Sequence, residues 1–163
     1  MKKEDRIKKC GALCPVIYSI IIAAIVGFDQ LVKYAATHYL KDMPSKEIIP
    51  NIFTLDYVKN SGAAFSMFSG NKLILIAFPA MAILAMLFYI FAKPHNTMLG
   101  LGFVFIISGG IANLIDRLKM EYVIDYFNLH GFAVFNFADI FVCLGCSLVV
   151  IELLFFEGRR RKE

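Results

Sequence analysis

Charged residues are scarce in this chain of 163 residues. Asp, Glu, Lys and Arg together make up 18% of it, whereas hydrophobic residues make up 59%. Typical soluble domains contain about 25% charged and about 45–50% apolar residues. The balance excludes an ordinary soluble domain and indicates a membrane protein. The length predicts one domain that spans residues 1–163.

Metal-binding side chains are also few, and repeats and low-complexity segments are absent. The three histidines are too scattered to suggest a metal site. The four cysteines form two close pairs, Cys10 with Cys14 and Cys143 with Cys146. The membrane spans inferred below place one pair at the cytoplasmic end and the other in the outer half of the bilayer, which disfavours a four-thiolate zinc site. We predict no metal and no cofactor, and we interpret the cysteines as small core residues.

The net charge of +4 comes from basic residues at the two ends of the chain. Five Lys or Arg residues lie within residues 2–9, and four lie within residues 159–162. Basic flanks of apolar runs are topology signals and lipid-headgroup anchors more often than nucleic-acid-binding arms. We therefore expect membrane lipids as partners and no nucleic acid.

Long apolar runs are the main positive feature. Residues 11–28, 73–92 and 96–115 contain no charge, and each run is long enough to cross a hydrocarbon core of about 30 Å. A fourth apolar run, 132–156, is interrupted by Asp139 and Glu152, so a spanning helix there must include one of them near an end. We predict four transmembrane helices, at about 11–30, 73–92, 96–115 and 136–156.

The distribution of Lys and Arg predicts the orientation of these helices. Four spans place both tails and the 93–95 connection on one side with ten Lys and Arg, against six within residues 41–72 and 117–119 on the other. The positive-inside rule then predicts that both termini are cytoplasmic. On the outer side, short β-branched and aromatic runs broken by Pro50 and Asn51 predict a strand-containing platform within residues 41–70. Residues 119–131 form a second outer connection.

This topology gathers acidic residues at one depth. Asp29 ends the first helix, Asp116 ends the third, and Asp139 lies in the first turn of the fourth. Asp125, in the connection between the last two helices, is tethered to the same layer. Acids near the bilayer boundary are costly to desolvate and usually face a bundle interior or a wet cavity.

Each acid also has a simpler interpretation. Asp29 can mark a helix end among the headgroups, and Asp116 can form a local charge pair with Arg117. Asn136 and Asp139 have the spacing of a helix cap, with Asp139 at the positive end of the helix dipole. Asp125 can be a simple loop acid. This interpretation is the weakest of the four, because apolar residues flank Asp125 on both sides.

Two carboxylates in a partly dry site share a proton, because both cannot ionise easily. The ionised member can activate water, and the neutral member can protonate a carbonyl or a leaving nitrogen. The same acids would suit a proton- or cation-coupled transporter, and the spacing alone does not choose between these functions. A transporter predicts polar residues through the bilayer, which the 73–92 run lacks. A third function, that of a non-catalytic membrane adaptor, would not explain the cluster of acids.

Five sequence blocks, taken together and in order, resemble those of the bacterial lipoprotein signal peptidases, also called signal peptidase II. The blocks are Phe28-Asp-Gln-Leu-Val-Lys-Tyr34, Asn60-Ser-Gly-Ala-Ala-Phe65, Gly109-Gly-Ile-Ala-Asn-Leu-Ile-Asp-Arg117, Val123-Ile-Asp-Tyr126 and Phe135-Asn-Phe-Ala-Asp139. Each block alone is a weak signal, but five in this order within a four-helix chain of this size are highly specific.

The resemblance implies an all-α polytopic fold with four transmembrane helices and a small extracytoplasmic β-cradle. It implies an aspartic endopeptidase of the bacterial cell membrane that acts as a monomer near the extracytoplasmic face. Its substrates would be prolipoproteins, cut before a cysteine that carries diacylglycerol. The implied catalytic residues are Asp125 and Asp139. The implied substrate-binding or supporting residues are Asp29, Asn60, Asn113, Asp116, Arg117 and Asn136.

Two residues depart from the family pattern. Ile124 and Tyr126 stand where Val and Phe are commoner, and the Tyr126 hydroxyl needs a partner or water. Because Asn113 and Asp116 are three residues apart, they share a helix face and are expected to bond toward the acids. Asn60 and Asn136 are expected to hold backbone or substrate amides. The helix dipole and the apolar flanks favour an ionised Asp139 and a protonated Asp125.

Overall fold

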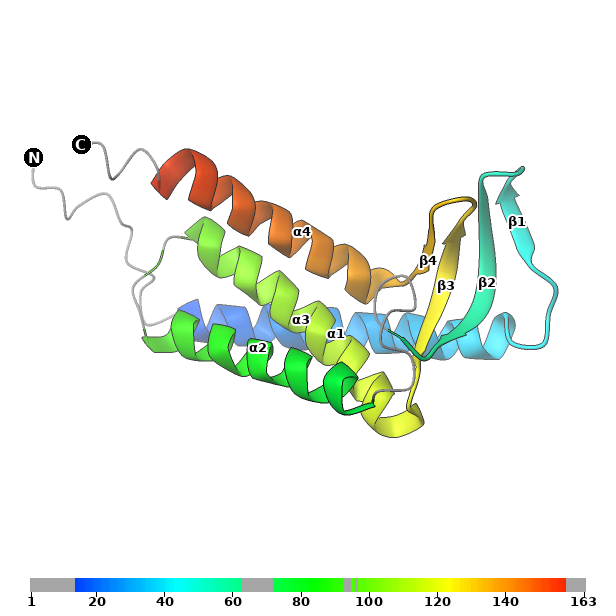
Figure 1. Cartoon of the computed structure of the whole chain (residues 1–163), viewed down its shortest axis with the longest axis horizontal. Coiled ribbons are helices and arrows are strands. Elements are labelled where there is room, and N and C mark those ends of the chain that lie inside the picture. The colour runs from blue at the N-terminus through cyan, green and yellow to red at the C-terminus, as the bar shows by residue number, and fades with distance from the viewer. Residues whose placement is uncertain (1–13, 63–71, 93–94, 96, 158–163) are drawn as a thin grey trace, which may run out of the picture.

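The computed structural model describes residues 14–62, 72–92, 95 and 97–157. Within them, four helices form a bundle with a four-stranded sheet at one end (Figure 1). The helices are α1 (Cys14–Tyr39), α2 (Lys72–Ala92), α3 (Thr97–Met120) and α4 (Phe137–Ile151), which continues as a π-helical turn, Glu152–Glu157. All four are long and apolar enough to cross a membrane. The predicted fold class is therefore confirmed.

Two helices extend beyond their predicted ends, because charged side chains are accommodated inside the bundle. We expected α1 to end at about residue 30, but it continues to Tyr39, and its later part runs beneath the sheet (Figure 1). Asp29 and Lys33, one helical turn apart in α1, form an ion pair that is almost fully buried. α3 likewise continues to Met120, past the predicted end at residue 115. A charge-free run therefore underestimates the length of a helix whose charged residues form ion pairs inside the bundle.

The sheet is antiparallel, with the strand order β1-β2-β3-β4. β1 (Lys46–Ile49) and β2 (Phe53–Asn60) lie within the predicted outer region, whose residues 63–70 are outside the described part. β3 (Val123–Leu129) and β4 (Ala133–Phe135) come from the segment between α3 and α4. Residues 119–131, which we interpreted as a second outer connection, do join α3 toward α4, but most of them form strand β3. Pairing with β2, which is distant in the sequence, makes β3 a strand.

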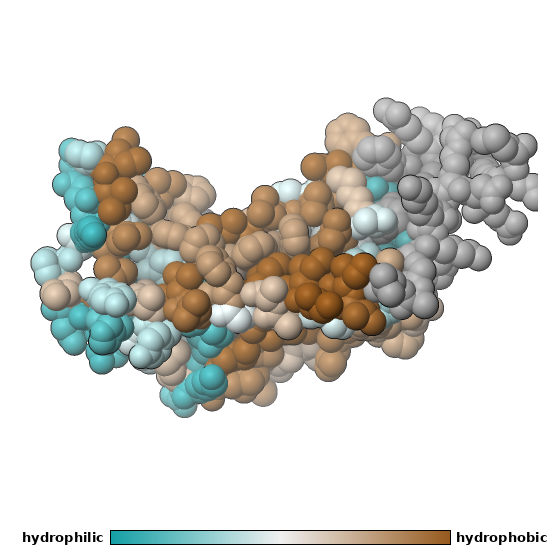
Figure 2. All heavy atoms as spheres, turned by 180° about the vertical axis from the view of Figure 1, so that it is seen from behind, coloured by the Kyte–Doolittle hydropathy of each residue, from teal (hydrophilic) through white to brown (hydrophobic). Residues whose placement is uncertain are grey.

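The surface of the helices is apolar. Figure 2 shows hydrophobic side chains over the helical part and hydrophilic ones gathered at the end that carries the sheet. Leu31, Phe78 and Phe88, for example, are each at least 65% exposed. Cys143 and Cys146 are also exposed on α4, so their assignment to the core was wrong. A small apolar side chain loses little by facing lipid, because hydrocarbon replaces the protein interior as its environment.

Small residues allow α3 to pack closely against its neighbours. A Cβ added at Gly109 would collide with the carbonyl oxygen of Ala138, in the first turn of α4. One added at Gly110 would lie 3.1 Å from the Ile83 side chain of α2, and Ala112 is fully buried. This close packing, predicted for the glycines and Ala112, sets the distance between α3 and the start of α4, where Asp139 lies.

Candidate active site

Asp139 is held by the start of its own helix. Asn136 caps α4: its side-chain oxygen accepts from the Asp139 backbone N–H at 3.0 Å. In return, Asp139 Oδ2 accepts from the Asn136 backbone N–H at 3.1 Å. This reciprocal pair is a capping box, and it confirms the predicted cap. The first turn of α4 therefore restricts the Asp139 carboxylate and offers it the positive end of the helix dipole.

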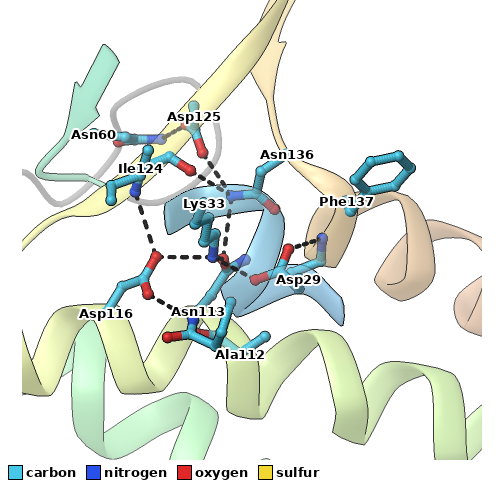
Figure 3. Close-up of polar contacts among 12 residues, drawn as sticks. Asp29, Lys33, Asn60, Ala112, Asn113, Asp116, Ile124, Asp125, Asn136 and Phe137 are labelled. Carbon is cyan, nitrogen blue, oxygen red and sulfur yellow. Dashed lines mark hydrogen bonds and ion pairs between the residues drawn. The ribbon is translucent and has the colours of Figure 1, made fainter. Parts of the chain in front are cut away.

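Asp125 lies on β3 and is 2% exposed. Asn60, at the end of the neighbouring strand β2, donates to Asp125 Oδ2 at 2.8 Å. Asn136 donates through Nδ2 to Asp125 Oδ1 at 2.7 Å (Figure 3). Burial raises the pKa of Asp125 to about 6, with the charge of Asp139 adding to the increase and the Asn60 and Asn136 hydrogen bonds opposing it.

Asn136 brings the two acids together. It bonds to Asp125 through its side-chain amide, and to Asp139 through its backbone N–H and side-chain oxygen. Asp125 and Asp139 come from a strand and a helix that meet at this fully buried asparagine. The structure thus places both predicted acids in one polar site at the sheet end of the bundle, where Asp125 is buried and Asp139 is partly buried.

Asn113 connects α3 to the same site. Its Nδ2 donates to Asp139 Oδ1 at 2.8 Å, and its Oδ1 accepts from Asn136 Nδ2 at 3.2 Å. The expected hydrogen bond from Asn113 toward the acids is confirmed. Asp116 was also expected to bond toward the acids, but its carboxylate accepts hydrogen bonds from other donors. It accepts from Lys33, from Gln30 at 2.8 Å and from the backbone N–H of Ile124 at 3.4 Å.

Two of the simpler interpretations are wrong. Asp29 is fully buried and does not mark a helix end among the headgroups. Asp116 pairs with Lys33 at 2.8 Å, while Arg117 donates to the Gly62 carbonyl oxygen at 3.0 Å. The side chain of Arg117 thus turns toward the chain that follows β2.

Three side chains satisfy the first three N–H groups of α4. The Tyr126 hydroxyl accepts from Phe137 N at 3.1 Å, Asp29 Oδ1 accepts from Ala138 N at 2.8 Å, and Asn136 accepts from Asp139 N. A helix start leaves such donors without intrahelical partners. The Tyr126 hydroxyl, which departs from the family pattern, thus has its partner in the backbone that carries Asp139.

Lys33 is the residue that the sequence analysis missed. It lies at the centre of the polar cluster in Figure 3, between Asp29, Asp116 and Asn113. Its four-residue spacing from Asp29 was the available signal, because such a pair shares one helix face. Ending the first helix at residue 30 hid this signal.

Comparisons with known proteins agree with this geometry. The family model described as signal peptidase (SPase) II matches residues 21–155. The chain belongs to the signal peptidase II family. It is therefore a peptidase of the membrane, and its four apolar helices make it a multi-pass protein.

Individual members of the signal peptidase II family show how far the similarity extends. A lipoprotein signal peptidase of Clostridioides difficile (strain 630) is 39% identical over 147 residues, which cover 89% of this chain and 99% of that protein. One from Caldanaerobacter subterraneus subsp. tengcongensis is 35% identical over 85% of this chain and 96% of its own length. A solved bacterial membrane enzyme superposes with a TM-score of 0.81 at 26% identity, covering 90% of this chain and 93% of its own.

Proposed function

We propose that this peptidase removes the signal peptide from prolipoproteins by cutting before a cysteine that carries diacylglycerol. The observation that carries the proposal is the meeting of Asp125 and Asp139 at the buried Asn136, where the helices join the sheet. This site suits a substrate that is itself anchored in the bilayer. We also propose that the chain is a single membrane-embedded domain that acts as a monomer. The Lys and Arg distribution supports cytoplasmic termini and an extracytoplasmic site.

Asp125 and Asp139 divide the proposed chemistry between them. Asp139, ionised at the start of α4, takes a proton from a water molecule whose oxygen attacks the scissile carbonyl carbon. Asp125, protonated in its buried position on β3, donates its proton to the carbonyl oxygen. The tetrahedral intermediate then collapses: Asp125 takes back a proton from one of the intermediate's two hydroxyls, the C–N bond breaks, and the proton held by Asp139 passes to the leaving nitrogen. Asn113, Asn60 and Asn136 orient the two carboxyl groups by their hydrogen bonds.

The direct test compares two forms of one precursor. Purified protein in detergent is incubated with a prolipoprotein whose cysteine carries diacylglycerol and with the same precursor lacking the lipid. We expect mass spectrometry to show a cut immediately before the cysteine in the lipidated form and little cleavage of the other. The acyl chains position the scissile bond at the bilayer boundary, which is their main contribution. Equal cleavage of both forms would contradict the proposed specificity.

The pH dependence of cleavage tests the division of roles. If Asp125 must be protonated, kcat/KM falls as the pH rises through the pKa of Asp125, about 6 in the free enzyme. In Asn60→Ala, the loss of the hydrogen bond to Oδ2 destabilises the ionised form, so this pKa rises. We expect the falling limb of the profile to move to higher pH. If Asn60→Ala instead moves the limb along which activity increases with pH, Asp125 would be assigned as the base.

A further inference from the structure

We propose that Lys33 is a positioning residue, whose ammonium group sets the spacing and orientation of the two aspartates. This inference rests on the proposed function, since it concerns how the same site is held. An ammonium group has three N–H donors and no acceptor. In this structure it contacts three acceptors: Asp29 Oδ2 at 2.9 Å, Asp116 Oδ2 at 2.8 Å and Asn113 Oδ1 at 2.8 Å.

Each of the three acceptors in turn holds a segment that carries an aspartate of the pair. Asp29 accepts from Ala138 N in the first turn of α4, beside Asp139. Asp116 accepts from Ile124 N on β3, beside Asp125. Asn113 donates to the Asp139 carboxylate itself. Lys33 is therefore the common partner of three paths, two that lead to Asp139 and one that leads to Asp125. Figure 3 shows the contacts of Lys33 with Asp29, Asp116 and Asn113.

Lys33 also decides which way the Asn113 amide faces. An amide can present either oxygen or nitrogen to a neighbour, but a lysine can only donate. Lys33 Nζ and Asn136 Nδ2 both lie against Asn113 Oδ1. The Asn113 NH₂ group must then turn toward Asp139, where it donates to Oδ1. Without Lys33, one of the two donors that hold the amide in this orientation is lost.

A contribution to stability alone does not explain why a lysine is buried at position 33. Lys33 is 2% exposed within a membrane-spanning helix, where ionisable residues are costly and usually functional. Replacing buried ion pairs with apolar residues of similar volume is often neutral or stabilising. A buried ammonium whose three hydrogen bonds all lead to the catalytic segments is better explained by the geometry that it imposes.

The test is Lys33→Met, which keeps most of the side-chain volume and removes every donor. With the lipidated precursor, we expect kcat to fall about 100-fold, the size of effect that a misplacement of about 1 Å produces. KM should stay within about twofold, because Lys33 does not touch the substrate. Lys33→Arg should not restore the rate, since a planar guanidinium cannot reproduce the three contacts. Lys46→Met, which changes an exposed lysine on β1, is the matched control and should cleave like the wild type.

Coupling to Asn113 separates positioning from a general structural effect. If Lys33 acts in part through the Asn113 amide, Lys33→Met should lower kcat by a smaller factor in the Asn113→Ala background than in the wild type. The same fold-decrease in kcat in both backgrounds would overturn the role assigned to the amide. A kcat within about threefold of the wild type in folded Lys33→Met would overturn the whole proposal. If the wild type itself does not cleave the precursor, the proposed function fails instead.

Removing Lys33 leaves Asp29 and Asp116 buried without a counter-charge, so the single variant can fail to fold. The double variant Asp29→Asn, Lys33→Met removes one charge of each sign and keeps the charge balance of the cluster. Size-exclusion chromatography and thermal unfolding in detergent would establish the fold of both. We expect the folded double variant to be slow as well. If neither variant folds, Lys33 is required for the fold, and the positioning role is overturned.

Discussion

Asp125→Asn and Asp139→Asn should each lower the rate of prolipoprotein cleavage by about 10²–10⁴-fold, the usual contribution of a general acid or base. Asparagine keeps the shape of the side chain but can neither take a proton from water nor give one to the carbonyl. Each variant should remain folded and membrane-inserted. The measurement is the cleavage rate of the lipidated precursor by mass spectrometry, with size-exclusion chromatography as the check on folding.

The matched control for these substitutions is Asp42→Asn. Asp42 is exposed between α1 and β1 and has a φ of 66°, a conformation that asparagine tolerates well. We expect this variant to cleave at the rate of the wild type. Asp29→Asn and Asp116→Asn should differ from both groups by also lowering the yield of folded protein, because these acids neutralise Lys33. Near-normal turnover by folded Asp125→Asn or Asp139→Asn would exclude the two-acid mechanism.

Gly109→Ala should damage both stability and cleavage through one added methyl group. The new Cβ would meet the Ala138 carbonyl oxygen, which belongs to the backbone and cannot rotate away. Overpacking of this kind costs about 1–3 kcal/mol. If α4 shifts to relieve this contact, Asp139 moves with it, and a displacement of about 1 Å lowers the cleavage rate by about 100-fold. Thermal unfolding in detergent and the cleavage rate of the lipidated precursor measure the two effects.

Gly27→Ala supplies the control for this prediction. Gly27 also lies in a membrane-spanning helix, but a Cβ added there would meet nothing within 4 Å. Alanine is the better helix former by about 1 kcal/mol in an exposed helix interior. We therefore expect the stability to be unchanged or slightly raised and the activity to be normal. Equal behaviour of the two alanine variants would show that contact between α3 and α4 does not position Asp139.

The spanning helices and the depth of the acids were predictable from local features of the sequence. Charge-free runs such as 73–92 reveal a spanning helix because the bilayer excludes unpaired charge over a fixed thickness. The cap at Asn136 was predictable for a similar reason, since residues three apart interact within one helical turn. Because successive spans run in opposite directions, the sequence also predicted that four aspartates lie at one depth. Family motifs added the choice of Asp125 and Asp139, a choice that the spacing alone left open.

Only the tertiary structure decided how the polar groups pair. Lys33 and Asn113 are 80 residues apart in the sequence, and no local pattern predicts that an ammonium on α1 bonds an amide on α3. β3 became a strand because β2 and β4 provide hydrogen-bond partners for its backbone, a condition that its own residues do not contain. Asp116 pairs with Lys33 and not with the adjacent Arg117, because neighbours on a helix point in different directions. The sequence therefore determined which groups gather at one end of the helix bundle, and long-range packing determined the partner of each.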